Sequence, residues 1–254
     1  AACCGLVGLK ASRGRVSVGP DAGDSFLAID GVLTRTVADT AAALDVLTGY
    51  ELGDATWAPP PPEPYVESAR REPGNLRVGL ALKPPLEGAE LEPVYERAAR
   101  DAAELLASLG HEVQEIDPPW SNREVLSDFT RAFGPLVSMQ TMIGGIIRGR
   151  EPTEEDVEPL TWSMYDRART QDTLTYLAAE GRIKTLAREV VAYLHDYDVV
   201  LTPALARLPV AINEIHGRGP DPWGHYQRSG FFTPYTAIFN VTGLPAISLP
   251  LYQS

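Results

Sequence analysis

Apolar residues in the middle of the chain follow two different periods. Residues 76–82 (LRVGLAL) form a short continuous apolar run, which predicts a buried strand. Residues 92–110 predict an amphipathic helix closed by Gly110, with one apolar face made of Val94, Ala98, Ala102, Leu105 and Leu106. Residues 111–117 (HEVQEID) predict the returning strand. Such a strand–helix–strand unit normally makes a right-handed crossover in a parallel sheet.

The same periods predict further elements on both sides of this unit. Thr34 or Thr36 can cap a helix over about 36–48, with Gly49 as its stop. Residues 123–195 look helical, and residues 198–205 (DVVLTPAL) predict a strand that ends at Pro203. The last segment holds a turn at NVTGLP and a buried strand at AISLPL. The alternation predicts an α/β fold with a mixed, mostly parallel central sheet flanked by helices.

A proline-rich connector divides the chain. Prolines 59–62 are consecutive, and they force an extended segment that cannot lie in a helix or an inner strand. We interpret it as a surface strap between lobes rather than a recognition motif. The predicted organisation of the domain 1–254 is therefore a core segment over 1–50, a connector over 51–75, and an α/β and helical remainder over 76–254.

Composition and charge restrict the partners. With 44% hydrophobic residues, the 254-residue chain can bury a sizeable core. Its 34 acidic and 22 basic residues give a net charge of −12, and the acidity is spread along the chain. Nucleic acids and anionic membranes are bound through clustered basic surfaces, so neither is expected as a partner. The longest apolar stretches are broken by prolines and charges, so no membrane span is expected either.

The two cysteines, Cys3 and Cys4, are neighbours and cannot build a disulfide framework. The four histidines show no ligand spacing relative to them, so neither a metal nor another cofactor is expected. We predict that both cysteines are buried reduced thiols that pack as small hydrophobic residues. The cysteine content also favours a cytoplasmic location.

The residues alone indicate no complete active site. The sequence lacks G-x-S-x-G, S-x-x-K, H-E-x-x-H and P-loop motifs. Lys10 and Ser12 form the one close lysine–serine pair and would point to the same side of an extended chain, but nothing orders a base against a nucleophile there. His195 lies at a predicted helix end, where a cation complements the helix dipole. We therefore assign no catalytic residue.

Several segments together resemble the amidase signature family. AACCGLVGLKASRGRVSVGP resembles the stretch directly after the family's catalytic loop, and DGVLTRTVADTAAALDVLTG resembles the helix that follows. YDVVLTPAL and FNVTGLPAISLPL resemble a later family strand and a turn with its strand. These matches occur in family order and span most of the chain, whereas residues 123–195 are not diagnostic. Ala11, Ala204 and Leu244 depart from the common Pro, Thr and Gln, and the last two departures bear on the pocket.

The resemblance implies hydrolysis of a carboxamide C–N bond by a serine nucleophile, a bridging serine with a cis peptide, and a lysine base. In the family, a neutral lysine amine takes the proton through the bridging serine, and backbone N–H groups hold the oxyanion. All three residues would precede Ala1, and family segments would follow Ser254. We therefore expect the chain to be the C-terminal part of an amidase, truncated at both ends and inactive alone.

A second hypothesis remains open. The chain would then be a non-catalytic, amidase-like piece that acts with a partner chain, as in an amidotransferase of several subunits. The acidic balance disfavours tRNA contact by this half. The expected ligand under the first hypothesis is a small-molecule amide, and a homodimer is left open.

Aromatic and sulfur side chains are the candidates for substrate contact, because ligand pockets are mostly apolar. The candidate substrate-binding residues are Met139, Trp162, Tyr165, Phe231 and Phe232. Taken singly, each is better explained as a core residue. Residues 217–230 are rich in glycine, proline and polar residues and are expected to form a loop at the rim of the pocket.

Overall fold

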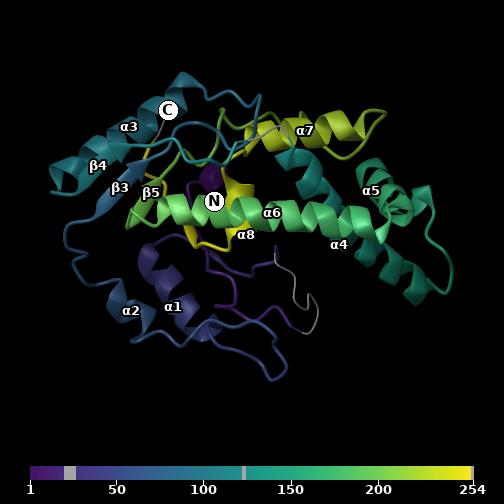
Figure 1. The fold of residues 1–254 in the computed structure, drawn as a ribbon, viewed down its shortest axis with the longest axis horizontal. Helices are drawn as coiled ribbons and strands as arrows, with labels where there is room; N and C mark the ends of the chain where they lie inside the picture. The colour runs from purple at the N-terminus through teal and green to yellow at the C-terminus, as the bar shows by residue number, and fades with distance from the viewer. Residues whose placement is uncertain (20–26, 122–123, 253–254) are drawn as a thin grey trace.

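The described strands form two separate sheets, and Figure 1 labels the strands of one of them, β3, β4 and β5. The computed structural model describes residues 1–19, 27–121 and 124–252. One sheet is antiparallel, in the order β2-β1-β6, from Leu33–Thr34, Val7–Lys10 and Ala246–Ser248. The other is parallel, in the order β4-β3-β5, from Glu112–Glu115, Arg77–Leu80 and Val199–Leu201. The predicted α/β class and its parallel strand–helix–strand unit are confirmed, with the strands divided between two sheets.

Eight α-helices are described around these sheets. Their bounds are α1 Val37–Leu47, α2 Tyr65–Ser68, α3 Pro93–Ser108, α4 Val125–Arg148, α5 Pro159–Thr170, α6 Thr173–Leu194, α7 Pro222–Phe232 and α8 Thr236–Thr242. Short 3₁₀ turns lie at Ala2–Cys4 and Glu154–Asp156. The predicted helices over 36–48, 92–110 and within 123–195 are therefore confirmed.

Local chemistry explains where several helices begin. Thr36 caps α1, because its Oγ1 accepts a hydrogen bond from the Asp39 N–H at 3.0 Å. Asp172 caps α6 in the same way, accepting from the Thr175 N–H at 3.0 Å. The α7 helix combines a cap at Asp221 with proline in its first turn, which supplies the backbone angle that a helix needs.

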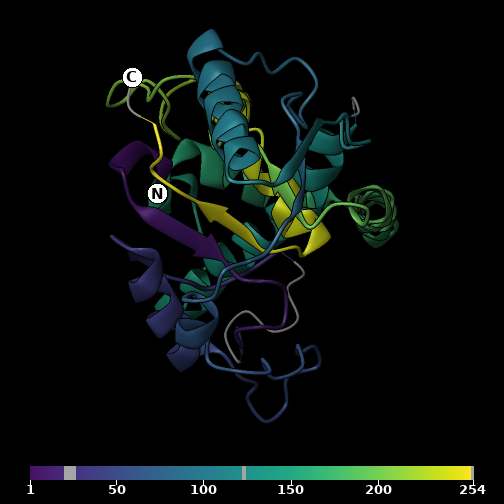
Figure 2. The ribbon, with the colours of Figure 1, turned by 90° about the vertical axis from the view of Figure 1, so that its left-hand side faces the viewer.

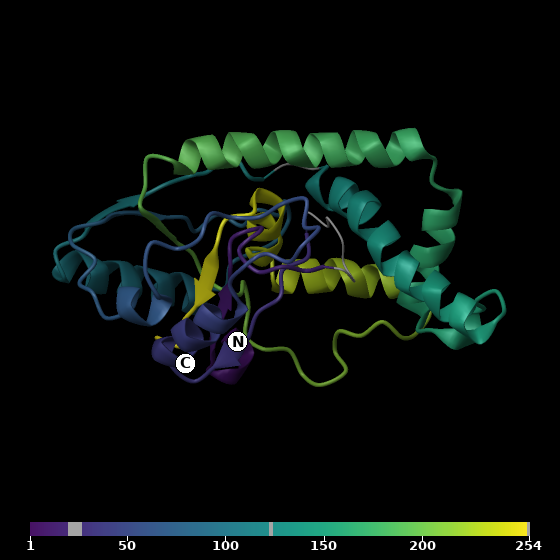
Figure 3. The same ribbon diagram turned by 90° about the horizontal axis from the view of Figure 1, so that it is seen from below.

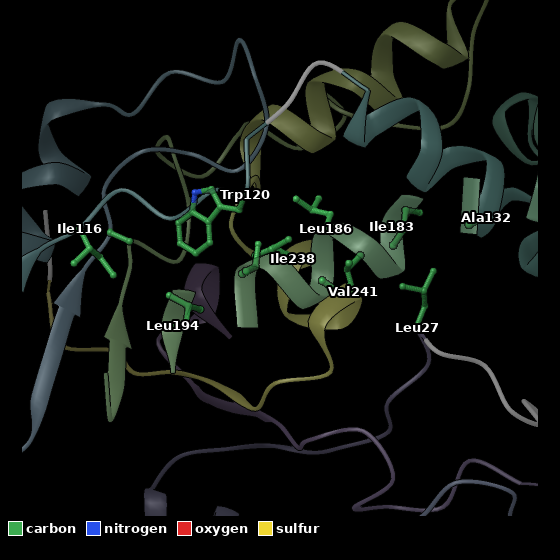
Figure 4. Close-up of a cluster of buried hydrophobic side chains, with 12 residues drawn as sticks. Leu27, Ile116, Trp120, Ala132, Ile183, Leu186, Leu194, Ile238 and Val241 are labelled. Carbon is green, nitrogen blue, oxygen red and sulfur yellow. The ribbon is translucent and has the colours of Figure 1, made fainter. Parts of the chain in front are cut away.

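The main hydrophobic core lies between α6 and α8 and extends to the end of the parallel sheet (Figure 4). Trp120 is fully buried in it and donates its indole N–H to the Lys83 carbonyl at 3.0 Å. Around it lie Ile183, Leu186 and Leu194 of α6 together with Ile238 and Val241 of α8. Figure 3 shows α6 running along one side of the molecule, with α8 and α7 beneath it and α4 crossing obliquely toward α5.

The parallel sheet has a second, smaller core against α3. Leu80 and Leu82 pack there with Ala99 and Ala103. Gly79 in the central strand β3 permits close packing on the side of the main core, because a Cβ at that position would lie 2.4 Å from Cδ1 of the main-core residue Ile116. The continuous apolar run at 76–82 thus corresponds to a strand that is covered on both faces.

Arg13 joins the beginning and the end of the described chain. Its Nη2 donates to the carbonyl oxygens of Asn240 and Val241 at 2.9 and 3.0 Å, near the end of α8. Its backbone N–H donates to the Gly243 carbonyl at 3.0 Å, and Gly243 has a left-handed φ of 76°. Figure 2 shows β1 and β6 lying side by side next to this junction.

Two local predictions are wrong, and a third holds in part. Residues 217–230 do not form one loop, because the Asp221 cap and Pro222 start α7 within them. The turn predicted at NVTGLP is shorter than expected, since residues 240–242 complete α8 and the chain turns only at Gly243. The strand in AISLPL is not buried. It forms β6, the outer strand that pairs with β1, and its Ile247 is 47% exposed.

The prediction for the cysteines is also wrong. Cys3 and Cys4 lie in a 3₁₀ turn that ends in left-handed Gly5, and both side chains are exposed. Apolar neighbours in the sequence suggested burial, but burial depends on which layers pack over the turn, and both side chains are exposed.

A buried carboxylate holds α4 against α6. Asp128 is 4% exposed, and its two oxygens accept hydrogen bonds from Arg182 Nε and Nη2 at 2.7 and 2.6 Å. Arg131 Nη1 lies 3.5 Å from the same carboxylate. The bidentate geometry fixes the relative position of the two helices as well as pairing the charges.

Replacement of Arg182 by leucine should lower the free energy of unfolding, and by more than the loss of an exposed ion pair, because the buried Asp128 carboxylate loses the two hydrogen bonds from Arg182. Urea denaturation followed by circular dichroism would measure the change. The matched control is Arg70→Leu, whose ion pair with Glu67 is exposed on both sides and should contribute less than about 1 kcal/mol. Equal effects of the two substitutions would contradict the role of Asp128 and Arg182.

Candidate substrate pocket

An apolar pocket of about 180 Å³ opens between four helices and the turn at Pro85 and Leu86. Its walls come from α4, α6, α7 and α8. The main core holds α4, α6 and α8 together, and the pair of Asp128 and Arg182 also joins α4 to α6. The lining residues are Pro85, Leu86, Val125, Leu126, Phe129, Ile183, Leu186, Tyr226, Ser229, Gly230, Thr233, Pro234, Thr236, Ala237, Ile238 and Val241. None of these lining residues carries a formal charge at neutral pH, so the walls suit an uncharged ligand.

Local hydrogen bonds use the hydroxyl protons of two lining threonines. Thr233 Oγ1 donates to the Ser229 carbonyl at 3.1 Å, within the end of α7. Thr236 Oγ1 donates to the Thr233 carbonyl at 3.1 Å, at the start of α8. These bonds stabilise the connection between α7 and α8.

Tyr226 is the phenol in the wall of the pocket. Burial raises the pKa of its hydroxyl above the usual value, so the group stays protonated at neutral pH. A protonated phenol can donate one hydrogen bond and accept others. The hydroxyl lies 3.5 Å from Thr130 Oγ1, and Thr130 does not line this pocket.

Lys10 is a partly buried lysine whose surroundings lower its pKa. Its Nζ donates to the Ala11 carbonyl at 2.8 Å. Burial, with a smaller contribution from the positive charge of Arg13, lowers its pKa from 10.5 to about 8. Within the described residues Lys10 and Ser12 share no hydrogen bond, so this pair lacks the geometry of a nucleophile and its base.

The structure separates the five substrate-binding candidates. Met139 lies on α4 and is 51% exposed, whereas Trp162 and Tyr165 pack together on α5 with ring centroids 5.6 Å apart. Phe231 and Phe232 lie on α7, directly after the lining residue Gly230. None of the five lines the 180 Å³ pocket, and their contact with substrate remains a prediction.

The residues that do line the pocket carry little signal in the sequence. Leu126 and Phe129 on α4, and Ile183 and Leu186 on α6, have the three-residue spacing of an ordinary apolar helix face. Tyr226 lies in the segment expected to be a loop.

In the part of the chain that the structure describes, no three His, Cys, Asp or Glu side chains converge to hold a metal ion. No helix among the described residues is long and apolar enough to cross a membrane.

The comparisons with known proteins define the class. The family model described as Amidase matches residues 1–254, and the chain belongs to this family. The 6-aminohexanoate-cyclic-dimer hydrolase of Paenarthrobacter ureafaciens is 35% identical over 267 residues, which cover 100% of this chain and 54% of that protein. A putative amidase of Synechocystis is 32% identical, covering 99% of this chain and 46% of the relative. The chain thus spans about half the length of the curated relatives it matches.

Solved structures agree with the family assignment. A structure of 6-aminohexanoate cyclic dimer hydrolase complexed with substrate superposes with a TM-score of 0.89 at 33% identity, covering 100% of this chain and 55% of that chain. A bacterial aryl acylamidase of the amidase signature family gives a TM-score of 0.78 at 20% identity, covering 98% of this chain and 52% of that chain. The second likeness shows the fold alone.

The Lys10 amine should titrate with a midpoint near pH 8 in the folded protein, and Lys10 should be acylated by acetic anhydride below the pH that the unfolded chain requires. Competitive labelling with peptide mass spectrometry would resolve it from Lys83 and Lys184. Because the unfolded state then binds more protons between about pH 8 and 10.5, Lys10 makes the free energy of unfolding rise with pH across that window.

The Lys10→Met variant should show a smaller rise across the same window. An identical labelling midpoint in folded and guanidinium-unfolded protein would contradict the lowered pKa.

Proposed function

We propose that this chain is part of an amidase that hydrolyses a carboxamide C–N bond by serine nucleophile chemistry. The observation that carries the proposal is the family match over all 254 residues, together with a TM-score of 0.89 to the cyclic dimer hydrolase. The serine–serine–lysine set implied by the family lies outside these 254 residues. This chain contributes the sheet next to that set and a pocket for the uncharged part of the substrate.

The pocket supports an amide with a neutral, largely aliphatic group. A charged group would lose its hydration there without gaining an ionic partner from the lining residues, and such burial is unfavourable. The name of the 6-aminohexanoate-cyclic-dimer hydrolase identifies an aminohexanoate derivative as that relative's substrate. We propose a related class for this chain, namely uncharged amides with short polymethylene segments.

The alternatives drawn from the sequence remain proposals. Phe231 and Phe232 are the best placed of the five candidates, because they follow Gly230 at the pocket wall. Action with a separate partner chain, a homodimer and a cytoplasmic location rest on sequence reasoning alone.

The test compares two proteins: the polypeptide expressed in full from the reading frame that encodes this chain, and the 254-residue chain by itself. Release of ammonia or amine would be measured with hexanamide, hexananilide and the cyclic dimer of 6-aminohexanoate. We expect turnover by the full polypeptide only, with a preference for uncharged acyl groups over matched amides that carry a terminal carboxylate.

Two results would contradict the proposal. One is the absence of amide turnover by the folded full polypeptide. The other is turnover by the 254-residue chain that Ser12→Ala or Lys10→Ala abolishes, which would place the chemistry at that pair instead.

A further inference from the structure

We propose that His216 and His225 hold residues 214–221, the latch segment, against the start of α7 only while both imidazoles are neutral, and that uptake of a proton by either ring releases the segment. The two rings are stacked, with centroids 4.1 Å apart and planes tilted by 31°. The inference goes beyond the proposed function, because it concerns how one wall of the pocket is supported and needs no assumption about the bond that is cleaved.

Each imidazole accepts a backbone hydrogen bond through its Nδ1 atom. The Arg218 N–H donates to His216 Nδ1 at 3.1 Å, and the His216 N–H donates to His225 Nδ1 at 3.4 Å. A nitrogen that accepts uses its lone pair, so each neutral ring carries its one proton on Nε2. Both nitrogens of an imidazolium are donors, so protonation would place an N–H opposite each backbone N–H. Charging either ring therefore removes a hydrogen bond and leaves two donors facing each other.

The latch segment connects two helices near the pocket. At one side the Leu160 N–H of α5 donates to the Gly217 carbonyl at 3.0 Å. At the other side His225 lies in α7, directly before Tyr226, a residue that lines the pocket. Release of the latch segment would thus remove contacts that support the α7 wall of the pocket.

The surroundings favour the neutral state of His225. Burial is the largest cause that lowers the pKa of its imidazole below the usual value, and the positive charges of Arg228 and of a protonated His216 add to it, against an opposing effect of Asp221. Arg228 and Asp221 also lie 3.8 Å from each other. The other charged groups on the elements around the pair are Glu158 and Arg167 at α5 and Glu214 and Arg218 in the latch segment.

The direction of the pH dependence follows from these contacts. In the released segment the imidazoles have ordinary pKa values of about 6.5, so the released state binds more protons than the latched state below that pH. The equilibrium constant for release should therefore rise as the pH falls below about 6.5, approaching tenfold per pH unit for each proton taken up. Ordinary carboxylates titrate near pH 4, so Glu158, Glu214 and Asp221 would act in a lower range.

Hydrogen–deuterium exchange of the polypeptide expressed in full tests the inference without any substrate. Peptides that cover 214–221 would be followed by mass spectrometry between about pH 5 and pH 8, and their rates compared with an unstructured peptide of the same sequence at each pH. This comparison removes the intrinsic effect of pH on exchange. Protection of the latch segment should be constant above about pH 7 and fall below pH 6.5.

Asparagine and phenylalanine variants separate the hydrogen bonds from the rings. The Oδ1 atom of asparagine can occupy the place of Nδ1 and accepts at every pH in this range, so the double variant His216→Asn, His225→Asn should lose the pH dependence. His225→Phe keeps a ring without an acceptor and should exchange faster even at pH 8. The matched control is His111→Asn, because His111 Nδ1 also accepts a backbone N–H, from Leu76 at 3.2 Å, but at β4. It should leave the exchange of 214–221 unaltered.

Nitrogen NMR of the imidazoles keeps the inference testable if the variants do not fold. In the unaltered polypeptide at pH 7.5, His216 and His225 should both show an unprotonated Nδ1 and a protonated Nε2. A protonated Nδ1 on either ring at that pH, protection that does not change between pH 5 and 8, or an unchanged slope in the double asparagine variant would overturn the assignment. Because no step depends on amide turnover, these results and those on the proposed function can fail independently.

Discussion

The burial of one face of α6 is the interaction on which the rest of this structure depends. Ile183, Leu186, Ala187, Val190 and Leu194 recur at helical spacing and all lie in the main core. The helix leads through Tyr197 into β5, so its position also sets that of the parallel sheet. Near the middle of α6, Arg182 reaches the buried Asp128 of α4. Displacement of α6 would therefore move the sheet and the pocket together.

Two residues of α6 contribute to both the core and the pocket, and this limits how they can change. Ile183 and Leu186 belong to the main core and also line the pocket. Shortening either side chain would enlarge the pocket, but it would also remove apolar contacts that stabilise the fold. Residues on α7 are freer to vary, because none of them is fully buried. Specificity for the ligand is thus easier to change from α7 than from α6.

The sequence predicted the elements whose signals are local and failed where tertiary packing decides. The helix over 36–48 and the parallel unit at 76–117 were found because Thr36 is a cap and the apolar periods are clear. The α7 helix was missed because Gly224, Gly230 and polar residues weaken its period, although Asp221 and Pro222 are a readable start signal. The exposure of Cys3 and Ile247 depends on which layers cover them, and a residue type alone does not give that.

The pocket could not be predicted for a related reason. Leu126, Phe129, Ile183 and Leu186 have the spacing of a helix face that packs against other helices, and nothing in that pattern says whether the opposing space is filled. The sequence likewise does not say which oxygen each tyrosine hydroxyl meets: that of Tyr235 donates to the Leu82 carbonyl, whereas that of Tyr226 lies 3.5 Å from Thr130 Oγ1. Both arrangements are made by elements that folding brings together. An open space between helices and the partner of a polar side chain therefore leave no period in the sequence, although both decide what the site can bind.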